Sequence, residues 1–514
     1  MARKQKGRAN PSSCNHVLIC ELRDKHRKHV IKMTITLTVE IGKSEVKNFS
    51  GLVREIYRIV LGVGRELLKT ALEQLDDEVL AGRDTARYRC KGFQKTCIKT
   101  IMGAVEYKRR VYVDEAAVEG KHCVYLLDQE LEMDKVGLVS EEVCQIAATA
   151  VCETTYRGAA ELISETTGLA ISAQGVWDII QRLGESQVSL VQRHAELAQL
   201  HKGTGALVTK LLYEENDGVW LKLQGESRKK YGVSKEMKVG IAYDGVQWAE
   251  TRSGKRRVLD NKVAYASFEN VRDFRKNKEG LVASRFDVDE IELRVYNGDG
   301  AQWIRQQNSE ECIDVLDSFH RNRKITECVR DPQFAALLRG LLYSKNIDLL
   351  LECLEAQINS VTDTAESEKL KELQNYYKEN RDSLLGYYDR GIPIPETRVP
   401  GVIHHARLGS MESNVFTLIG NRMKGRRACW SEKGANNLAM LLCQRHTVGF
   451  EDLFATLPAK PESSSRITDP PVYNSSKIPK REGKGYEWRD CLHISDAPNW
   501  MRGFLKELIS NHNL

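Results

Sequence analysis

Residues 211–223 read LLYEENDGVWLKL, with apolar residues on both sides of Asp217 and Gly218. Apolar runs of this length, rich in branched and aromatic residues, are typical of β-strands. The chain continues with strand-like runs at 238–248, 262–268, 291–296 and 312–316, and with a helix-like stretch at 274–286. We therefore expect a mixed α/β sheet built from this part of the chain.

The order of these segments predicts the fold class. Three strands, a helix, a strand, a helix and a strand follow one another, which is the element order of an RNase H-like core. Residues 321–390 interrupt that order because they are almost wholly helical and rich in Leu, Glu and Lys. We expect an α/β RNase H-like catalytic core with an all-helical insertion, preceded by an N-terminal α+β and helix-turn-helix region.

The chain length predicts several domains, at roughly 100–200 residues each. We expect a basic arm and strand, a helix plus β-hairpin region, a helical and helix-turn-helix-like DNA-binding domain, the RNase H-like core, the helical insertion, core-closing helices, and a tail rich in Pro, Ser and Lys. The corresponding ranges are 1–50, 51–135, 136–204, 205–320, 321–400, 401–450 and 451–514.

Residues 140–200 carry the helix-turn-helix pattern. Ser140 is placed to cap a first helix, a second covers about 156–165, and Ser172 is placed to cap a third. In a DNA-binding unit the outward face of the third helix contacts base edges in the major groove. Gln174, Gln181 and Arg182 are the candidates for those contacts. Three-helix packing without DNA contact is the alternative.

The composition is that of an ordinary globular protein. The 514 residues are 41% hydrophobic and 29% charged, which excludes a disordered chain, a collagen or a coiled-coil rod. No run approaches the roughly 18 apolar residues of a membrane helix. The basic start lacks the pattern of a signal peptide. We expect a cytoplasmic protein without a membrane partner.

Cysteines and cations add two further expectations. The 13 cysteines are scattered, and the cluster Cys14, His16, Cys20, His26 and His29 misses zinc-finger spacing, so free thiols are expected. Residues 1–32 hold nine Lys or Arg against two acids. Such a run is either a solvated face or a site of phosphate contact. A second basic cluster consists of Arg422, Lys424, Arg426 and Arg427.

Three acids are placed at the ends of expected elements. Asp217 lies within the first strand, Asp299 follows the fourth strand in Asn-Gly-Asp-Gly, and Glu412 lies in the first turn of a helix after the insertion. Open α/β sheets bind ligands at the carboxyl ends of their strands. Three converging carboxylates would require cations, and Mg²⁺ is the usual ion of phosphate chemistry. Asp244, in Tyr-Asp-Gly, is a local competitor, and spacing alone does not choose between them.

A resemblance makes the choice. Residues 408–438 read LGSMESNVFTLIGNRMKGRRACWSEKGANNL, which resembles the C-terminal signature of the ISLre-type insertion-sequence transposases of bacteria. The stretches 217–220 (DGVW), 296–303 (YNGDGAQW) and 317–320 (DSFH) are similar to the same family, and the last also to the related Mutator-type DDE transposases. The similarity extends from about residue 50 to 445.

The resemblance implies site residues and cofactors. Asp217, Asp299 and Glu412 would be the metal ligands, for Mg²⁺ with Mn²⁺ as a substitute, and His320 would lie beside them as a catalytic residue. Arg422, Lys424, Arg426 and Arg427 would contact DNA phosphates. Trp430 would either stack on an unpaired base or pack in the core.

The resemblance also implies the reaction. A DDE-type transposase cleaves phosphodiester bonds at the ends of its element and joins the freed 3′-hydroxyl to target DNA, with two metal ions about 4 Å apart. We expect double-stranded DNA as partner, a homo-oligomer on that DNA, and association with the bacterial nucleoid. A nuclease with the same core and a DNA-binding regulator derived from a transposase are the alternatives.

Overall fold

The computed structural model describes residues 48–117, 122–133, 136–200, 205–251, 254–305, 311–395, 408–425, 427–447 and 450. It also describes the backbone of two paired strands, β1 (Cys14–Arg23) and β2 (Val30–Val39). The side chains of the basic arm, Arg426, and the tail after residue 450 lie outside the described part. Within that part no helix is long and apolar enough to span a bilayer.

The N-terminal unit is a long helix packed on a small sheet. Helix α1 (Phe49–Gly82) covers the antiparallel strands β3 (Tyr88–Thr100), β4 (Gly103–Asp114) and β5 (His122–Val124), with the short α2 (Leu126–Glu130) beside them. The helix and hairpin expected here are both present, and both strands of the hairpin are longer than expected. Gly103 has a φ of +121° at the turn, a conformation that glycine adopts without strain.

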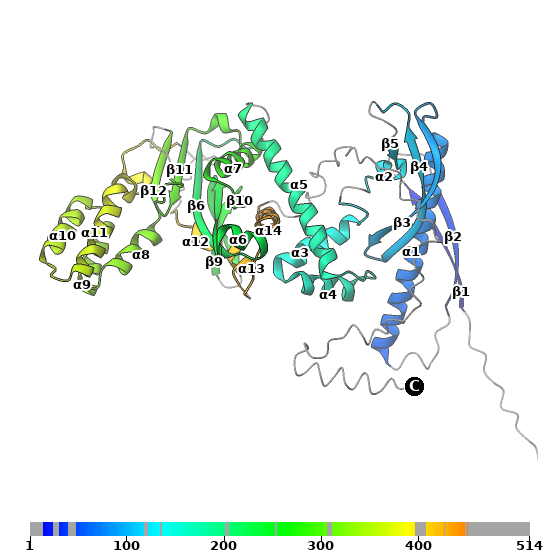
Figure 1. Ribbon diagram of the computed structural model, residues 1–514, viewed down its shortest axis with the longest axis horizontal. Coiled ribbons are helices and arrows are strands. Elements are labelled where there is room, and N and C mark those ends of the chain that lie inside the picture. Colours follow the sequence, from blue (N-terminus) through cyan, green and yellow to red (C-terminus); the bar gives the residue numbers. More distant parts are fainter. Residues whose placement is uncertain are drawn as a thin grey trace, which may run out of the picture.

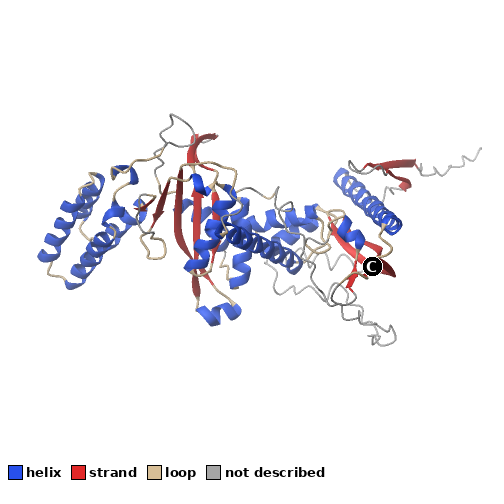
Figure 2. Cartoon of the chain, turned by 90° about the horizontal axis from the view of Figure 1, so that it is seen from above, coloured by secondary structure: helices blue, strands red, loops and turns tan. Residues whose placement is uncertain are grey.

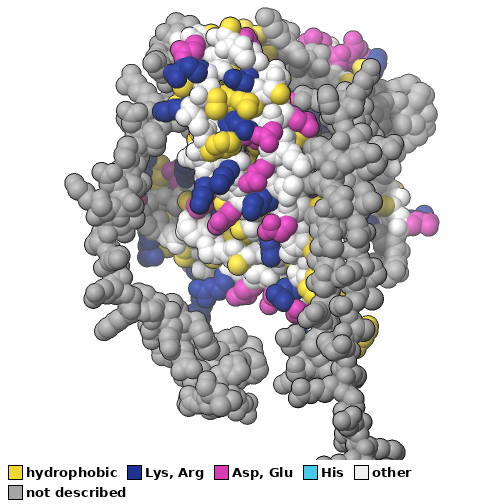
Figure 3. Space-filling view, turned by 90° about the vertical axis from the view of Figure 1, so that its right-hand side faces the viewer, with side chains coloured by type: hydrophobic (Ala, Val, Ile, Leu, Met, Phe, Trp, Pro, Cys, Tyr) yellow, Lys and Arg dark blue, Asp and Glu magenta, His cyan; other side chains and the backbone are white. Residues whose placement is uncertain are grey.

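The outer surface of this unit carries both signs of charge. Figure 3 views the molecule from this end, and the Lys, Arg, Asp and Glu side chains drawn in colour are interspersed there. Two ion pairs illustrate the pattern, Arg110–Asp77 at 2.7 Å and Arg89–Glu115 at 2.8 Å. The coloured part of this face is therefore not a uniformly basic surface.

Three helices follow, as the sequence predicts. They are α3 (Glu141–Glu153), α4 (Tyr156–Thr166) and α5 (Ala173–Gln199). Ser172 caps α5 by accepting a bond from the Gly175 N–H. Ser140 stands at the N-cap of α3, but its hydroxyl makes no capping bond. The apolar face of α5, with Val176, Ile179 and Leu183, is buried.

A five-stranded sheet forms the centre of the molecule, in the order β10-β7-β6-β11-β12. The bounds are β6 (Leu211–Lys222), β7 (Ser234–Tyr243), β10 (Val263–Ser267), β11 (Leu293–Gly298) and β12 (Cys312–Leu316). Strands β11 and β12 run parallel to β6, whereas β7 runs antiparallel to both β6 and β10. Within this sheet, β6, β7 and β10 thus form an antiparallel meander. Strands β11 and β12 extend the sheet on the other side of β6.

The structure differs from the expected elements in two places. The run 238–248 is not one strand, because β7 ends at Tyr243 and a separate hairpin, β8 (Gly245–Thr251) and β9 (Gly254–Asp260), follows. The sequence also predicts a helix between the fourth and fifth strands. The described residues of that connection, 299–305 and 311, contain a turn at 302–304 and no helix.

Helices cover both faces of the sheet. Helix α7 (Val271–Arg285) packs on one face, where Leu212, Ala242 and Val263 meet Val282 and Phe286. The strand residues that alternate with these, such as Val239 and Ile241, point to the opposite face. There they belong to a buried cluster that also includes residues between Met411 and Cys443. Because alternate residues of a strand point to opposite faces, even-numbered β6 side chains face α7 and odd-numbered ones face away from it.

The helices that the sequence predicts as an insertion begin directly after β12 and form a bundle with its own core. It consists of α8 (Ser318–Cys328), α9 (Pro332–Tyr343), α10 (Ile347–Ser360) and α11 (Thr364–Glu379). Leu338, Leu350, Leu354, Leu373 and Tyr377 form its buried centre. Figures 1 and 2 show it as a bundle at one end of the molecule, with the α1 unit at the other end.

The chain then returns to the sheet. Helix α12 (Met411–Val415), a π-helical turn η4 (Phe416–Gly420) and α13 (Asn421–Met423) follow without a break, and α14 (Glu432–Arg445) packs against α5 and β10. The remaining short elements are α6 (Gly225–Tyr231) and the 3-10 turns η1 (Val288–Glu290), η2 (Arg381–Leu384) and η3 (Tyr387–Asp389).

Candidate functional site

The central strand β6 presents acids to both faces of the sheet. Toward α7, Glu214 is buried in ion pairs with Lys278 at 2.6 Å and Arg294 at 3.0 Å. Burial raises the pKa of Glu214, but the two positive charges outweigh it and hold this pKa below its usual value. Glu214 therefore belongs to a satisfied charge cluster. Glu215 and Asp217 point to the opposite face, where the candidate site lies.

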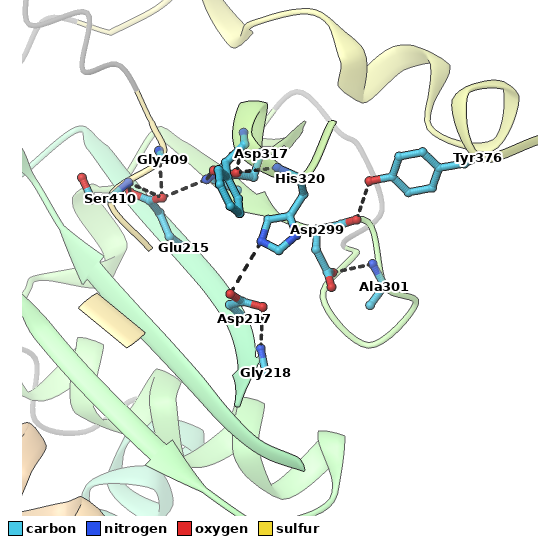
Figure 4. Close-up of polar contacts among 12 residues, drawn as sticks. Glu215, Asp217, Gly218, Asp299, Ala301, Asp317, His320, Tyr376, Gly409 and Ser410 are labelled. Atoms are coloured by element: carbon cyan, nitrogen blue, oxygen red, sulfur yellow. Dashed lines mark hydrogen bonds and ion pairs between the residues drawn. The ribbon is translucent and has the colours of Figure 1, made fainter. Parts of the chain in front are cut away.

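Asp217 stands at the open edge of that face. One of its carboxylate oxygens accepts a 2.7 Å bond from the Gly218 N–H, and the other lies 3.7 Å from Nε2 of His320 (Figure 4). The Asp217 side chain is 16% exposed, so it keeps contact with solvent. The strand thus fixes the backbone of Asp217 and leaves its carboxylate accessible.

Asp299 reaches the same place from the neighbouring parallel strand. It follows the last residue of β11, and its Oδ1 accepts a 2.8 Å bond from the Ala301 N–H. The Tyr376 hydroxyl, on α11, donates a 2.7 Å bond to the Asp299 carbonyl oxygen. The loop after β11 is therefore held both by its own turn and by α11 of the helical bundle.

His320 lies between these acids in the first turn of α8. Asp317 caps that helix by accepting bonds from the N–H groups of Phe319 and His320. The ion-pair contact with Asp217 raises the pKa of His320, and the charges of Asp317 and Asp299 raise it further against the effect of burial. The electrostatics thus favour an imidazolium facing a cluster of carboxylates.

A fourth acid, Glu236 on β7, is coupled electrostatically to Asp217 and Asp299 and is not evident from the sequence, but it pairs with Trp220 and so lies on the α7 face of the sheet. Burial raises its pKa, and the charges of Asp299 and Asp217 add to the rise while Lys238 opposes it. Its carboxylate occupies the space left by the absent side chain of Gly218, where a Cβ would lie 2.1 Å from Oε1 of Glu236. The β6–β7 register places it there, and a single sequence does not reveal that register.

A buried hydrogen-bond network connects the segments that carry the expected site residues. Glu215, fully buried, accepts bonds from Asn297 Nδ2 at 2.8 Å and from the N–H groups of Gly409 and Ser410 at 3.0 Å. Asn297 also donates to Asp317 Oδ2 at 3.0 Å. Figure 4 shows this chain of bonds beside Asp217 and His320.

The network has one member near each candidate residue. Glu215 is two residues before Asp217, Asn297 two before Asp299, Asp317 three before His320, and Ser410 two before Glu412. Burial raises the pKa of Glu215, and the bonds from Tyr243, Asn297, Gly409 and Ser410 counteract that rise. We conclude that Glu215 joins β6, β11, α8 and the start of α12.

Glu412 is not brought into contact with the two aspartates. It lies in the first turn of α12, which packs on β6 and β7, and its side chain is exposed. Within the described residues, no contact joins Glu412 to Asp217, Asp299 or His320. Nor does the described part contain three or more His, Cys, Asp or Glu side chains arranged to hold a metal ion.

Asp244, the competing acid, lies elsewhere. It follows the end of β7, is buried, and accepts bonds from Asn261 Nδ2 at 3.0 and 3.1 Å. Asp217 pairs with Val239 of β7, and Val239 lies five residues before Asp244 in the chain. At about 3.4 Å per residue the two acids are separated by roughly 17 Å along the strand. Asp244 therefore stabilises a turn at the other end of the sheet.

The three residues expected to face DNA on the third helix have different surroundings. Gln174 is exposed and bonds to Asp178 at 2.9 Å, and Arg182 donates to the Val136 carbonyl at 3.1 Å. The outward placement of Gln181 is wrong. Gln181 is 5% exposed and accepts a 2.8 Å bond from Asn437, because α14 packs on this side of α5.

The second basic cluster is divided. Arg422 donates to the Val151 carbonyl and lies between the rings of Tyr156 and Trp430, whereas Lys424 and Arg427 are exposed. Trp430 is 7% exposed and donates its indole N–H to the Met423 carbonyl, so it packs in the core and does not offer a face for stacking.

The cluster also lies away from Glu412. Residues 411–423 form one continuous helical stretch, with Glu412 near its start and Lys424 just beyond its end. At about 1.5 Å per residue, twelve residues correspond to roughly 18 Å. The cations and the carboxylates therefore occupy two separate regions of the surface.

Comparison with known proteins gives one result that covers most of the chain. No curated protein matches the sequence. A protein-family model matches residues 43–450, a range that includes the sheet, the insertion and both ends of the 411–423 helical stretch. The chain therefore belongs to the family described as "Uncharacterised protein family (UPF0236)".

Proposed function

We propose that this protein is a DDE-type DNA transposase of the ISLre type, acting on the ends of an insertion sequence. The observation that carries the proposal is the convergence of Asp217 and Asp299 on His320, from neighbouring parallel strands and across 82 residues of sequence (299 − 217). The sheet order β10-β7-β6-β11-β12, with β7 antiparallel and β11 parallel to β6, supports the proposal, as does the helical bundle that follows β12.

The two aspartates fit a divalent ion such as Mg²⁺ or Mn²⁺. Both offer hard carboxylate oxygens, and their negative charges already raise the pKa of Glu236 and His320. A bound ion would supply activation of an attacking oxygen and stabilisation of the leaving oxygen. Glu412 would be the third ligand, although the described contacts leave it apart from the pair.

The chain's own residues would position DNA. A protonated His320, held by Asp217 and capped into place by Asp317, would donate a hydrogen bond to a phosphate oxygen of the bound strand. Exposed Lys424 and Arg427 would contact phosphates farther along the duplex, about 18 Å from Glu412. Double-stranded element ends and target DNA would be the substrates, bound by a homo-oligomer at the nucleoid.

A DNA-binding regulator derived from a transposase is the second candidate. The exposed position of Glu412, without a contact to either aspartate, favours it. A nuclease with the same core would share the acids and would differ in the absence of strand joining.

The test is a cleavage and strand-joining assay on DNA ending in the element's terminal repeats. We expect Asp217→Asn, Asp299→Asn and Glu412→Gln each to lose more than about 100-fold in both steps while binding to end DNA persists, because each removes a negative charge from a unit that acts jointly. Asp244→Asn is the matched control and should retain activity.

The three candidate functions give different results in this assay. Cleavage without joining would indicate a nuclease, and binding without either step would indicate a regulator. Full activity of Asp217→Asn or Asp299→Asn would contradict the proposed site.

A further inference from the structure

A cavity of about 490 Å³ lies between the helices α3, α4 and α5 and the part of the chain that begins at α13. Residues of α3, α4 and α5 form one wall, and the other includes Asn421, Arg422, Gly425, Ala428–Ser431 and Gly434. Small-molecule sites typically have volumes of about 300–1,000 Å³. The cavity therefore has the size of a site for one small planar group, and it lies apart from the acids of β6 and β11.

Aromatic rings line this cavity. Tyr156, Trp177 and Trp430 contribute to its walls, with Arg422 between the rings of Tyr156 and Trp430 at 6.0 and 5.3 Å. Trp430 is packed in the core, but Trp177 is 37% exposed for a residue type that is usually buried. Trp177 therefore offers a ring to an occupant of the cavity.

One lining residue, Tyr156, carries an unsatisfied polar group behind the cavity wall. The Tyr156 hydroxyl is buried and has no hydrogen-bond partner among the described residues. Burial raises the pKa of Tyr156 to about 12, so the hydroxyl remains a donor at neutral pH. A buried hydroxyl without a partner costs free energy, and a ligand with a polar edge would satisfy it.

Cations stand next to the lining residues. Lys424 precedes Gly425, and Arg427 precedes Ala428, and both side chains are exposed while Gly425 and Ala428 line the cavity. Sites for unpaired nucleic acid combine such cations, which contact the backbone, with aromatic rings on which bases stack.

We propose that this cavity binds one unpaired nucleobase, which stacks on Trp177 and forms a hydrogen bond with the Tyr156 hydroxyl, while Lys424 and Arg427 contact the flanking phosphates. The inference rests on the proposed function, in which DNA is the partner. A paired and stacked base exposes neither of its faces. The inference therefore adds to the proposed function a site for a base that has left the duplex.

The experiment uses the full-length protein and labelled duplexes that contain a terminal repeat. One duplex is fully paired, one carries a single unpaired nucleotide, and one carries an abasic residue at the same place. We expect the unpaired nucleotide to increase affinity about tenfold over both other duplexes, since stacking of one base has roughly this effect. Trp177→Ala should abolish the increase, and Tyr156→Phe should reduce it.

The matched control is Trp248→Ala, which removes another exposed tryptophan, on β8, outside the cavity lining. It should leave the preference unchanged, and thermal unfolding should show all three variants folded. A free nucleoside monophosphate that competes away the preference would support the same site and identify a mononucleotide as an alternative source of the base.

Two results would overturn the inference. Equal affinity for the unpaired and abasic duplexes would do so, as would an undiminished preference in Trp177→Ala. Either result together with normal strand joining would contradict the nucleobase site alone. Failure to bind any of the duplexes would contradict the proposed function as well.

Discussion

Glu215 and Asp217 point to the same face of one strand, yet their surroundings give them different tasks. Glu215 is fully buried and accepts bonds from Tyr243, Asn297 and two backbone N–H groups. Asp217 keeps part of its carboxylate exposed beside His320. The first is therefore suited to hold elements together and the second to meet a ligand. The tetrapeptide EEND alone does not distinguish these roles.

The sequence predicts some of the residues that the structure brings together at the candidate site and misses others for a physical reason. Asp217, Asp299 and His320 were predicted through strand ends and a resemblance, and the structure brings these three together. Asn297 and Glu236 were missed because their roles depend on which residues of neighbouring strands face them. That register is a long-range property, since any one-residue slip would send their side chains to the other face.

Two half-buried histidines predict how stability depends on pH. Burial lowers the pKa of both His194 and His446 below 6.5 in the folded protein. The unfolded chain therefore binds more protons as the pH falls through about 6.5, and stability is lost in that range. His320, whose pKa is raised, contributes with the opposite sign.

We expect the variant His194→Gln with His446→Gln to lose less unfolding free energy than the native chain between about pH 7.5 and pH 5.5. Urea unfolding at the two pH values measures this difference. An equal or larger loss in the variant would show that these two groups do not set the slope.

At the scale of elements, periodic segments were predicted well and boundaries less well. The helix expected from Leu52 to Leu80 is α1, because a long apolar periodicity has few alternatives. The run 238–248 was predicted as one strand because its apolar residues continue past Asp244. The structure ends β7 at Tyr243, where the Asp244 N–H bonds to the Asp260 carbonyl and the hairpin begins.

The face of α5 was also only partly predictable. Its apolar stripe is buried as expected, but Gln181 is buried too, because Asn437 of α14, 256 residues later in the chain, packs against it. Helical periodicity specifies which residues share a face. It does not specify how many faces the rest of the protein covers.

The network around Glu215 predicts an effect on the site at the scale of elements. Glu215→Gln replaces one acceptor oxygen with an NH₂ group that cannot accept from Gly409, Ser410 or Asn297. Leaving buried donors without partners costs about 1–3 kcal/mol. We expect a loss of unfolding free energy in that range and a loss of strand joining greater than that of end-DNA binding, since the start of α12 is released from β6.

The control for this variant is Glu226→Gln on α6, which makes the same substitution at a side chain 86% exposed. Chemical unfolding and the joining assay measure the two effects. Unchanged stability of Glu215→Gln would contradict the network. Reduced stability with normal joining would show that the network supports the fold but does not position the site.

At the scale of the molecule, the helical unit and the sheet share one core. Val143, Ile163 and Ile180 of the helices belong to the same buried cluster as Val239 and Ile241 of the sheet. The two were expected as separate domains from their different patterns along the chain. A common core means that a contact between them supports both α3–α5 and the strands that carry the acids.

Helices α5 and α14 approach each other closely at Gly184 of α5. A Cβ at this position would lie 2.4 Å from Cβ of Asn437 on α14, and 2.8 Å from its carbonyl oxygen. Real Cβ atoms do not approach so closely, so the helices would have to move apart. We expect Gly184→Ala to destabilise the protein by about 1–3 kcal/mol, the usual cost of overpacking a core.

The control is the same substitution at Gly340, in the interior of α9, where a Cβ would meet nothing within 4 Å. There alanine only restricts the unfolded chain and favours the helix, so Gly340→Ala should stabilise by about 0.5–1 kcal/mol. The two changes are chemically identical and opposite in sign, so thermal or urea unfolding separates packing from helix propensity. Stabilisation of both variants would mean that α5 and α14 do not pack as closely at Gly184 as described.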